Sequence, residues 1–491
     1  MILTLLFVPI VLPLILGTLL PLFHFTQRKF RCIYVESAVI LTSVITWILL
    51  FIQPEGKFQA INLAGILEVS FHIDGAAMIF AGLVSILWPF ATLYAFEYME
   101  HEGGENRFFA FYIMTYGITL GIAFAANLMT MYMFYEALTL VTLPLVMHKM
   151  DRSAILAGRK YVFYSIGGAA FAFIGFIFIM HYGTTIDFSY GGVLDLVKVG
   201  DKANLLRMVY VLAVLGFGVK AAIFPFHGWL PTASIAPTPV TALLHAVAVV
   251  KAGAFAIIRI TYYSFGTSFL RGTWAQITVL SFVGATILYC SSKAVKEQHL
   301  KRRLAYSTSS NLSYILFGAL IMTPAGLVGS FSHMLFHAIM KITLFFAVGA
   351  ILCKTKKEYI YEIDGIGKQM PVIMSCFTIA ALSLMGMPPL AGFISKWNLG
   401  TAAIAEGGIT TKIVAGILIY SAFLTAIYLI TIIIRTYFPK EKKETEQTKE
   451  NFDPSWKMKI PMIIFAVAIL FLGFNSKTLI AFLEQVAAGK L

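Results

Sequence analysis

Seven ionisable residues lie inside strongly apolar stretches of this sequence, where charged side chains are rare. They are Glu136, Lys220, Lys251, His333, His337, Lys341 and Lys396. An ionisable group inside a membrane-spanning helix is costly and usually marks the route of an ion or a proton. Burial favours the neutral form of such a group, and a nearby opposite charge favours the charged form. A carboxylate that moves relative to a lysine therefore switches the lysine between its charged and neutral forms. The seven residues together predict proton storage and transfer.

Each lone residue also has a simpler interpretation. Glu136 is the one acid deep in a strongly apolar run, and the alternative to a proton site is an ion pair with a purely structural role. A lone lysine can extend its amine to the membrane surface, an alternative that applies mainly to Lys396 at the end of its run. Lys220 and Lys251 have no other charge nearby in sequence, so this alternative fits them poorly.

His333, His337 and Lys341 follow one another at intervals of four residues in SHMLFHAIMKITLFF. That spacing puts all three side chains on one face of a helix. A single buried histidine is more often a hydrogen-bonded core residue than a functional one. Three titratable groups on one face fit a proton relay better, because histidine exchanges protons near neutral pH.

The composition identifies the elements that must hold these residues. The chain has 491 residues, of which 59% are hydrophobic and 12% charged, and its mean hydropathy is +0.83. Soluble domains carry about 25% charged residues, so a soluble enzyme, a disordered chain and a disulfide scaffold are excluded. The composition predicts an all-α integral membrane protein that crosses the bilayer many times.

Charge and cysteine content narrow the class of protein further. The net charge is +13, but the basic residues lie in short loops between apolar runs, so we expect no nucleic-acid partner. The four cysteines are scattered without C-x-x-C spacing and predict neither an iron–sulfur nor a zinc site. We expect no cofactor and no metal on this chain.

Apolar runs long enough to span a bilayer predict about 14 transmembrane helices. They fall near 2–22, 32–52, 72–97, 108–126, 128–148, 160–181, 206–226, 239–262, 272–292, 304–322, 325–353, 371–395, 411–434 and 460–483. Loops that follow odd-numbered runs hold 24 of the 37 Lys and Arg residues, and the other loops and the C-terminal tail hold nine. The positive-inside rule then places the odd loops in the cytoplasm of a cell (inner) membrane and both termini on the outer face. The basic loop 435–459 is expected to be a solvated connector, with partner docking as the alternative.

Prolines predict interruptions in two of these helices. Pro225 follows Lys220, and Pro388 precedes Lys396. Proline removes a backbone donor, and the freed carbonyls are tolerated at membrane depth only against protein or water. One interrupted, lysine-bearing segment in each half is typical of paired transport sites in an inverted repeat.

Four stretches together resemble the antiporter-like subunits of respiratory complex I (chains L, M and N), of Mrp sodium/proton antiporters (A and D) and of membrane-bound hydrogenases and formate hydrogenlyase. The most specific is FPFHGWLPTASIAPTPVTALLHAVAVVKAG at 224–253. The others are NL…FYE at 127–136, KRRLAYSTSSNLSY at 301–314 and HAIMKITLFFAVG at 337–349. The resemblance covers about residues 70 to 400.

The resemblance implies fourteen helices, with helices 4–8 and 9–13 as two inverted five-helix repeats and with broken helices 7 and 12. The corresponding segments are 1–107, 108–262, 263–434 and 435–491. It also implies partners, namely other membrane subunits of one complex, together with protons, lipid and, as an open alternative, Na+.

By position, the resemblance implies a role for each candidate residue. Glu136 and Lys220 resemble the glutamate of helix 5 and its lysine partner on helix 7. Lys251 resembles the connecting lysine of helix 8, with His245 in a position that some members use. His333, His337 and Lys341 resemble the central group of helix 11, and Lys396 the terminal residue of helix 12. Asn311 stands where many members carry histidine, which puts titration at that position in doubt.

These features predict a proton-translocating subunit of a multisubunit complex, with Na+/H+ exchange as an open alternative. Driving energy would come from partner subunits, because the chain shows no ligands for a redox cofactor. Two other functions remain open, a stand-alone secondary transporter and a quinone-reacting redox subunit. The sequence also leaves open whether the complex is of the hydrogenase, Mrp or complex I type.

Overall fold

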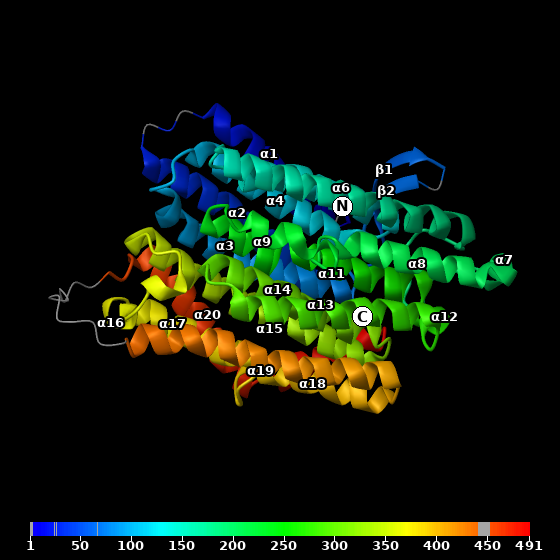
Figure 1. Ribbon diagram of the computed structural model, residues 1–491. Coiled ribbons are helices and arrows are strands. Elements are labelled where there is room, and N and C mark those ends of the chain that lie inside the picture. The colour runs from blue at the N-terminus through cyan, green and yellow to red at the C-terminus, as the bar shows by residue number, and fades with distance from the viewer. Residues whose placement is uncertain (1–2, 24, 26, 66, 440–451) are drawn as a thin grey trace.

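The computed structural model describes residues 3–23, 25, 27–65, 67–439 and 452–491, and these fold into a bundle of long helices (Figure 1). Each of the fourteen predicted segments overlaps one helix or a run of consecutive helical elements. Eleven helices in the described ranges are long and apolar enough to cross a membrane. The segments outside that set are α14 and the two that proline interrupts. The longest pieces of the interrupted segments, α8 and α18, have 16 residues each, fewer than the roughly 20 that a span needs.

The elements before the first predicted repeat are three long helices and one hairpin. In chain order they are a 3-10 turn Leu3–Phe7, α1 (Val8–Leu19), a 3-10 turn Leu20–Leu22, α2 (Arg28–Ile52), β1 (Phe58–Ala64), β2 (Leu67–Phe71) and α3 (Gly75–Met99). The antiparallel hairpin was not predicted, because the sequence analysis treated 53–71 as a loop. Burial acts against the charge of Lys57 at the base of the hairpin, but the carboxylates of Asp187 and Glu68 hold its pKa above the ordinary value. The Lys57 ammonium therefore fastens the hairpin to the loop after α6, 2.7 Å from Asp187 Oδ2.

The first predicted repeat contains α4 (Glu105–Phe124), α5 (Leu128–Val146), α6 (Arg152–Tyr182), α7 (Leu196–Val199), α8 (Ala203–Gly218), α9 (Trp229–Ala233), α10 (Thr238–Ala242) and α11 (Val249–Arg259). The second contains α12 (Thr267–Leu270), α13 (Trp274–Lys296), α14 (Leu300–Leu320), α15 (Pro324–Thr355), α16 (Ile366–Gln369), α17 (Pro371–Met385), α18 (Ala391–Glu406) and α19 (Ile409–Tyr437). The chain ends with α20 (Trp456–Phe474) and α21 (Lys477–Ala487). In both sets the fourth predicted span is interrupted, as the prolines predicted. The segment boundaries and the inverted symmetry stay predictions.

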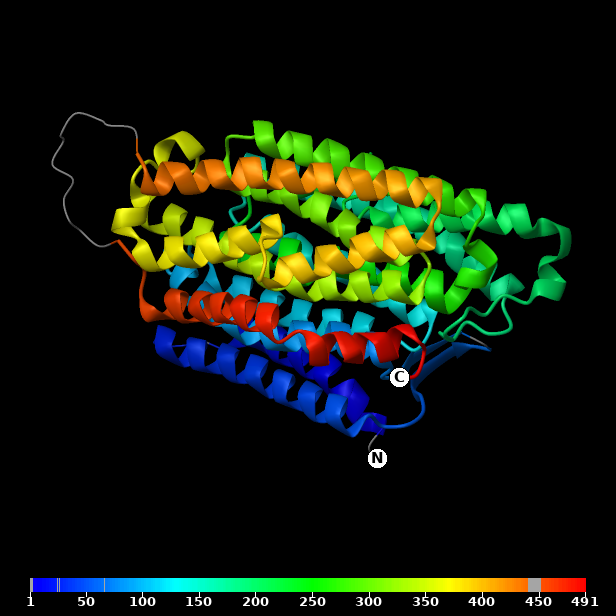
Figure 2. The ribbon, with the colours of Figure 1, turned by 90° about the horizontal axis from the view of Figure 1, so that it is seen from below.

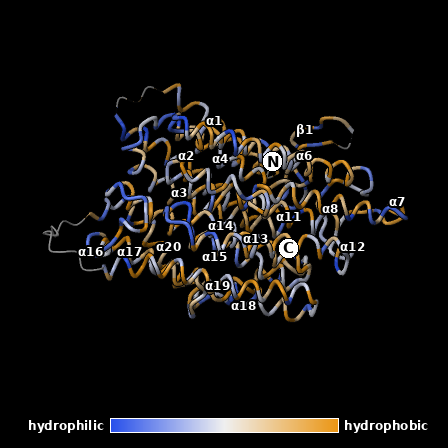
Figure 3. The backbone as a smooth tube through the Cα atoms, viewed as in Figure 1, coloured by the Kyte–Doolittle hydropathy of each residue, from blue (hydrophilic) through white to orange (hydrophobic). Residues whose placement is uncertain are grey.

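Two helices form the core of the bundle. The span from Thr238 to Phe265 is entirely buried, and α15 is buried over most of its 32 residues. The peripheral helices α2 and α20 both pack against α3, and their first turns line one pocket. Hydrophobic residues fill the middle of the helices and hydrophilic ones concentrate toward the ends (Figure 3). Five of the seven predicted ionisable residues are fully buried, whereas Glu136 and Lys396 are only partly buried.

Both ends of the described chain lie at the hairpin end of the bundle. Leu491 is next to the start of α3, and Leu3 is next to Gly56 before β1 (Figure 2). The opposite end carries the loops richest in lysine and arginine. Residues 440–451 of the predicted connector 435–459 lie outside the described residues.

Candidate functional site

The first interrupted helix carries Lys220 at its break. Helix α8 ends at Gly218, and the chain continues as an irregular turn until Phe226. Pro225 lies at the end of this turn, where the sequence predicted the interruption. The freed carbonyl groups find donors, because the Tyr135 hydroxyl donates to Phe217 O at 2.9 Å and Trp229 Nε1 donates to Val219 O at 2.7 Å. The carbonyls of Phe217 and Val219 at the break are therefore hydrogen-bonded, and the break directs Lys220 into the interior.

Lys220 faces α5, where the sequence predicted its partner. Its side chain is 1% exposed, and its Nζ lies 4.0 Å from Glu136 Oε1. The ammonium donates to the carbonyl of Tyr135 and lies over the Tyr135 ring. Glu136 Oε1 has no hydrogen-bond partner among the described residues, and the side chain is 28% exposed on the outside of the chain. The two charges attract without a direct hydrogen bond, so the pair is loose and reachable from outside.

The helix from Thr238 to Phe265 passes behind this turn and carries Lys251 between two π-helical segments, Leu243–Val247 and Ile260–Phe265. Short π segments recur at functional sites because they displace side chains from the regular helical register. Gly253 lies against the backbone of Lys220 and Ala221. This helix thus contacts the Lys220 turn through Gly253, and its Lys251 side chain points away from that turn.

Lys251 meets the histidine row of α15. Its Nζ lies 2.7 Å from Nδ1 of His337, and both side chains are fully buried. The rings of His337 and His333 have centroids 5.7 Å apart, and His333 Nδ1 lies 2.9 Å from the Ser395 hydroxyl. The Nε2 atoms of both histidines have no hydrogen-bond partner in the described part of the chain. The predicted common face of α15 therefore links Lys251 to α18.

Lys341 occupies the same face one turn further on. Its Nζ donates to the Ser307 hydroxyl at 2.6 Å and to the Leu304 carbonyl at 3.1 Å, both on α14. The Ser307 hydroxyl in turn contacts the hydroxyl of Tyr428. Asn311 donates to the Ser307 carbonyl at 2.8 Å. An amide neither gains nor loses a proton near neutral pH, so Asn311 supports this helix without carrying a proton.

The second interrupted helix holds Lys396 differently from Lys220. Pro388 lies between α17 and α18, and the Lys396 ammonium reaches back to the carbonyls of Leu384 and Met385 at 2.7 and 3.0 Å. A helix C-terminus carries partial negative charge and four unsatisfied carbonyls, so a cation there is favourable. Lys396 therefore points into the break and does not extend to the membrane surface.

His245 stands apart from the hydrogen-bonded row. It lies in the first π segment, fully buried, and neither ring nitrogen has a partner in the described ranges. The charges of Lys341, Lys301 and Lys251 act on its imidazole. His245 is thus placed between α14 and the row on α15, with both ring nitrogens unpaired within the described ranges.

Several residues of this row were missed by the sequence analysis. Tyr135 contributes a carbonyl and a ring to Lys220, and Tyr314 stacks on His333 with Lys396 Nζ 5.5 Å from its ring centroid. Ser307 was quoted only as part of a motif. The run of hydroxyl residues in STSSNLS was the available signal, because an apolar helix with many hydroxyl groups usually faces polar partners.

A large polar cavity opens at the lysine- and arginine-rich end of the bundle. Its volume is about 820 Å³, and residues that line it include Lys149, Lys160, His227, Lys301, Tyr289 and Glu358. The buried Lys301 ammonium donates to the Ala236 carbonyl at 2.9 Å, just before α10. The cavity therefore opens beside Lys301 and beside the residues that follow the first break, among them His227.

Comparison with known proteins places this geometry among membrane subunits. The family described as NADH:quinone oxidoreductase/Mrp antiporter, TM, matches residues 125–425, and the family described as NADH-Ubiquinone oxidoreductase (complex I), chain 5 N-terminus, matches residues 63–109. The first match contains every one of the seven predicted site residues.

Individual relatives are similar over most of the chain. NADH-quinone oxidoreductase subunit N of Desulforudis audaxviator is 29% identical over 82% of this chain and 82% of its own length. Subunit L of the Mycobacterium tuberculosis enzyme is 31% identical over 84% of this chain, which spans only 64% of that longer relative. In the solved structure of the membrane-bound sulfane sulfur reductase, an archaeal respiratory membrane complex, one chain has the same fold, with a TM-score of 0.84 at 20% identity over 98% of this chain and 96% of that one.

The contact between Gly253 and the Lys220 turn generates a prediction about stability. Alanine normally stabilises a helix relative to glycine by about 1 kcal/mol. At position 253, however, a Cβ would lie 2.6 Å from the Ala221 nitrogen, so Gly253→Ala forces the turn to move and destabilises by about 1–3 kcal/mol. The control is Gly167→Ala on α6, where nothing lies within 4 Å. We expect thermal unfolding in detergent to begin at a lower temperature for Gly253→Ala only; an unchanged or higher temperature would contradict the packing.

Proposed function

This chain belongs to the family of multi-pass membrane subunits described as NADH:quinone oxidoreductase/Mrp antiporter, and we propose that it translocates protons as one subunit of a multisubunit ion-pumping complex. The observation that carries this proposal is the buried row of titratable groups from Lys220 through Lys251, His337 and His333 to Lys396. Amines and imidazoles take up and release protons, whereas Na+ is coordinated by oxygen atoms. The row therefore fits the proton as the transported ion.

The loose pair of Glu136 and Lys220 acts as the switch of this pump. At 4.0 Å the carboxylate favours the charged form of Lys220, and moving it away removes that support in a region of low dielectric. Lys220 then gives up its proton. Because Glu136 is partly exposed on the outer surface, a charge change in a neighbouring subunit can displace it.

The released proton travels along the buried row. Between Lys220 and Lys251 a water molecule carries it, because the two amines point to opposite sides of the helix that separates them. From Lys251 it passes to Nδ1 of His337, across 2.7 Å, and then to His333. Ser395 and the break beside Lys396 receive it next. Lys341 and Ser307 form a side branch that leads to α14.

The amines along the row have only neutral partners beyond Lys220. Lys251 contacts a ring nitrogen, Lys341 a hydroxyl and a carbonyl, and Lys396 two carbonyls. Like charges repel strongly in a low-dielectric interior, so the row cannot hold a full set of positive charges at once. A proton that arrives at one end therefore promotes release at the other.

The basic end of the bundle is the side of proton uptake. There the 820 Å³ cavity brings water next to Lys301 and next to His227, which follows the Lys220 turn. By the positive-inside rule this end faces the cytoplasm of the cell (inner) membrane, which puts both termini on the outer face. Energy comes from redox chemistry in partner subunits or from an ion gradient.

Replacing Lys220 tests the switch. Lys220→Ala removes the amine, and Lys220→Arg keeps the positive charge but stays protonated, since a guanidinium does not release its proton in proteins. We expect both variants to lower the initial rate of proton uptake into inverted vesicles containing the complete complex by roughly tenfold or more. The control is Lys412→Ala, an exposed lysine at the start of α19, which should pump normally. Full activity of Lys220→Arg would refute the role of Lys220 as a proton carrier.

The contact between Lys251 and His337 predicts a non-additive pair of substitutions. If both groups pass the same proton, Lys251→Ala and His337→Ala each slow proton uptake, and the double variant is no slower than the worse single one. Uptake rates in the same vesicles, corrected for the amount of assembled complex, measure this. Independent, multiplying effects would show that the two residues do not form one step.

A further inference from the structure

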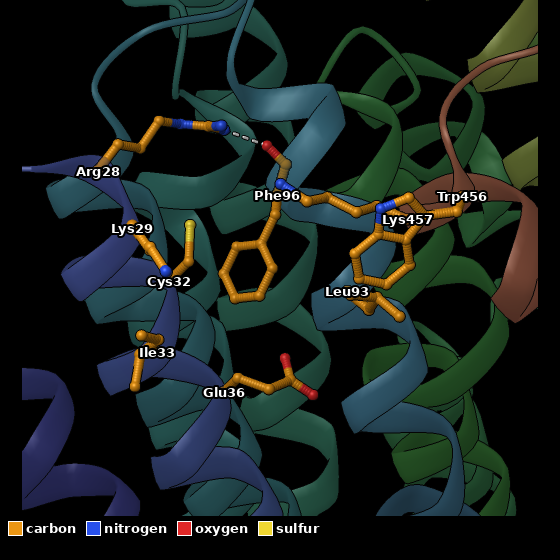
Figure 4. Close-up of a pocket in the computed structure, with 9 residues that line it drawn as sticks. All are labelled: Arg28, Lys29, Cys32, Ile33, Glu36, Leu93, Phe96, Trp456 and Lys457. Atoms are coloured by element: carbon orange, nitrogen blue, oxygen red, sulfur yellow. Dashed lines mark hydrogen bonds between the residues drawn. The ribbon is translucent and has the colours of Figure 1, made fainter.

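A groove on the outer surface of the bundle lies far from the proton row. It has a volume of about 530 Å³ and opens between the first turns of α2 and α20 and the end of α3. We call it the α2–α20 groove, and its residues include Lys29, Ile33, Leu93, Phe96, Trp456 and Lys457. In Figure 4, Lys29 and Cys32 lie on one side, Trp456 and Lys457 on the other, and the Phe96 ring between them.

One end of the groove is strongly basic. The Arg28 guanidinium is already compensated, because it pairs with Glu100 at 3.0 Å and Glu105 at 2.7 Å and donates to the Phe96 carbonyl (Figure 4). The ammonium groups of Lys29 and Lys457 have no ion-pair partner among the described residues. Two uncompensated cations thus lie on opposite sides of the same opening.

The N-terminus of α2 strengthens this positive field. Helix α2 begins at Arg28 and α20 at Trp456, and neither has an acidic residue in its first turn. A helix N-terminus carries partial positive charge and unpaired N–H groups, and acidic residues normally offset it. At α20 the terminus is already compensated, because Ser455 caps it and the Glu97 carboxylate accepts from the Ser455 N–H at 3.0 Å. The α2 terminus has no side-chain cap, so it would favour an anion in the opening between Lys29 and Lys457.

The rest of the groove is apolar and continues into the outer face of α2. Its walls are formed by Ile33, Leu93 and the Phe96 ring. Further along α2 the outward side chains of Ile40, Val44, Ile48 and Phe51 are exposed on the surface of the chain. Trp456, exposed beside Lys457, is the residue type that concentrates at the boundary between membrane and water. A ligand of this site therefore needs an anionic head and a long apolar tail.

The one acid in the groove lies away from its basic end. Glu36 follows Arg28 by eight residues on α2, which is about 12 Å along the helix axis, and it lies at the lower end of the groove in Figure 4. Its carboxyl is too deep to neutralise Lys29 or Lys457. An anion near the opening is likewise kept apart from it.

We propose that the α2–α20 groove binds one anionic phospholipid, with its phosphate between Lys29 and Lys457 and one acyl chain against the apolar walls. The two lysines and the N-terminus of α2 hold the phosphate. The apolar walls exclude water from the acyl chain and guide it onto the outer face of α2. A free phosphate would use only the upper end of the groove, and a neutral lipid only the lower part.

Accessibility of Cys32 reports directly on this site, because its thiol lines the groove. Cys290 and Cys376 are buried, so a Cys353→Ser background leaves Cys32 as the main accessible thiol. The full chain is reconstituted in nanodiscs of phosphatidylcholine with or without phosphatidylglycerol, and the rate of alkylation by N-ethylmaleimide is measured. We expect phosphatidylglycerol to slow alkylation several-fold and to remain bound, one molecule per chain, in native mass spectrometry.

Matched variants separate this site from general lipid contact. Lys29→Gln and Lys457→Gln should each reduce both protection and retention, whereas Lys459→Gln, two residues further on α20, should behave like the unchanged chain. Leu93→Trp narrows the apolar part and should lower retention with both lysines intact. An equal response of Lys457→Gln and Lys459→Gln would overturn the proposal.

Two further experiments test whether a free phosphate or a protein partner fills the α2–α20 groove instead. Glycerol phosphate in phosphatidylcholine nanodiscs should not protect Cys32; protection equal to that by phosphatidylglycerol would assign the site to a free phosphate and contradict the proposal. Protection that requires co-expressed membrane subunits and ignores the lipid would show that a protein partner covers the groove. Because both readouts measure binding, their outcome is independent of whether the proton row functions as proposed.

Discussion

The cost of holding a charged amine away from water is the constraint on which this structure depends. A lone ammonium in a low-dielectric interior is unstable unless opposite charge or oriented carbonyls surround it. The chain solves this for Lys220 with a carboxylate at 4.0 Å, the Tyr135 carbonyl and an aromatic face. None of these partners encloses the amine completely. Because the amine is only partly surrounded by these partners, the protonation of Lys220 is sensitive to small movements of Glu136. A proton switch requires this property.

Both interrupted helices expose backbone carbonyls at the break, but different side chains pair with these carbonyls in the two helices. In the first, the broken carbonyls are satisfied by Tyr135 and Trp229, which leaves Lys220 free to face α5. In the second, Lys396 itself satisfies the carbonyls at the end of α17. The charge of Lys220 is therefore stabilised by an acid on another helix, and that of Lys396 by the carbonyls at the end of α17. In the proposed pump this difference gives the row a direction, with a switch at one end and a receiving site at the other.

Sequence alone could predict the helices, their interruptions and the buried ionisable residues, because each has a local cause. Apolar runs mark the spans, Pro225 and Pro388 mark the breaks, and charges in such runs stand out. The hairpin at 58–71 was missed because two short strands between helices resemble a loop. The contact between Lys251 and His337 joins residues 86 positions apart, and the π segments around Lys251 arise from packing of the whole helix. These features depend on tertiary structure, which no single stretch of sequence contains.

The central claim is that Lys220 loses its proton when the Glu136 carboxylate moves away from it while the protein transports protons. Infrared difference spectroscopy of the complete complex, with isotope-labelled lysine and glutamate and with Glu136→Gln and Lys220→Arg for assignment, measures this during turnover. The account predicts carboxyl and amine bands that appear on energising the complex and vanish in both variants. Sustained proton pumping with no change in either band would contradict it.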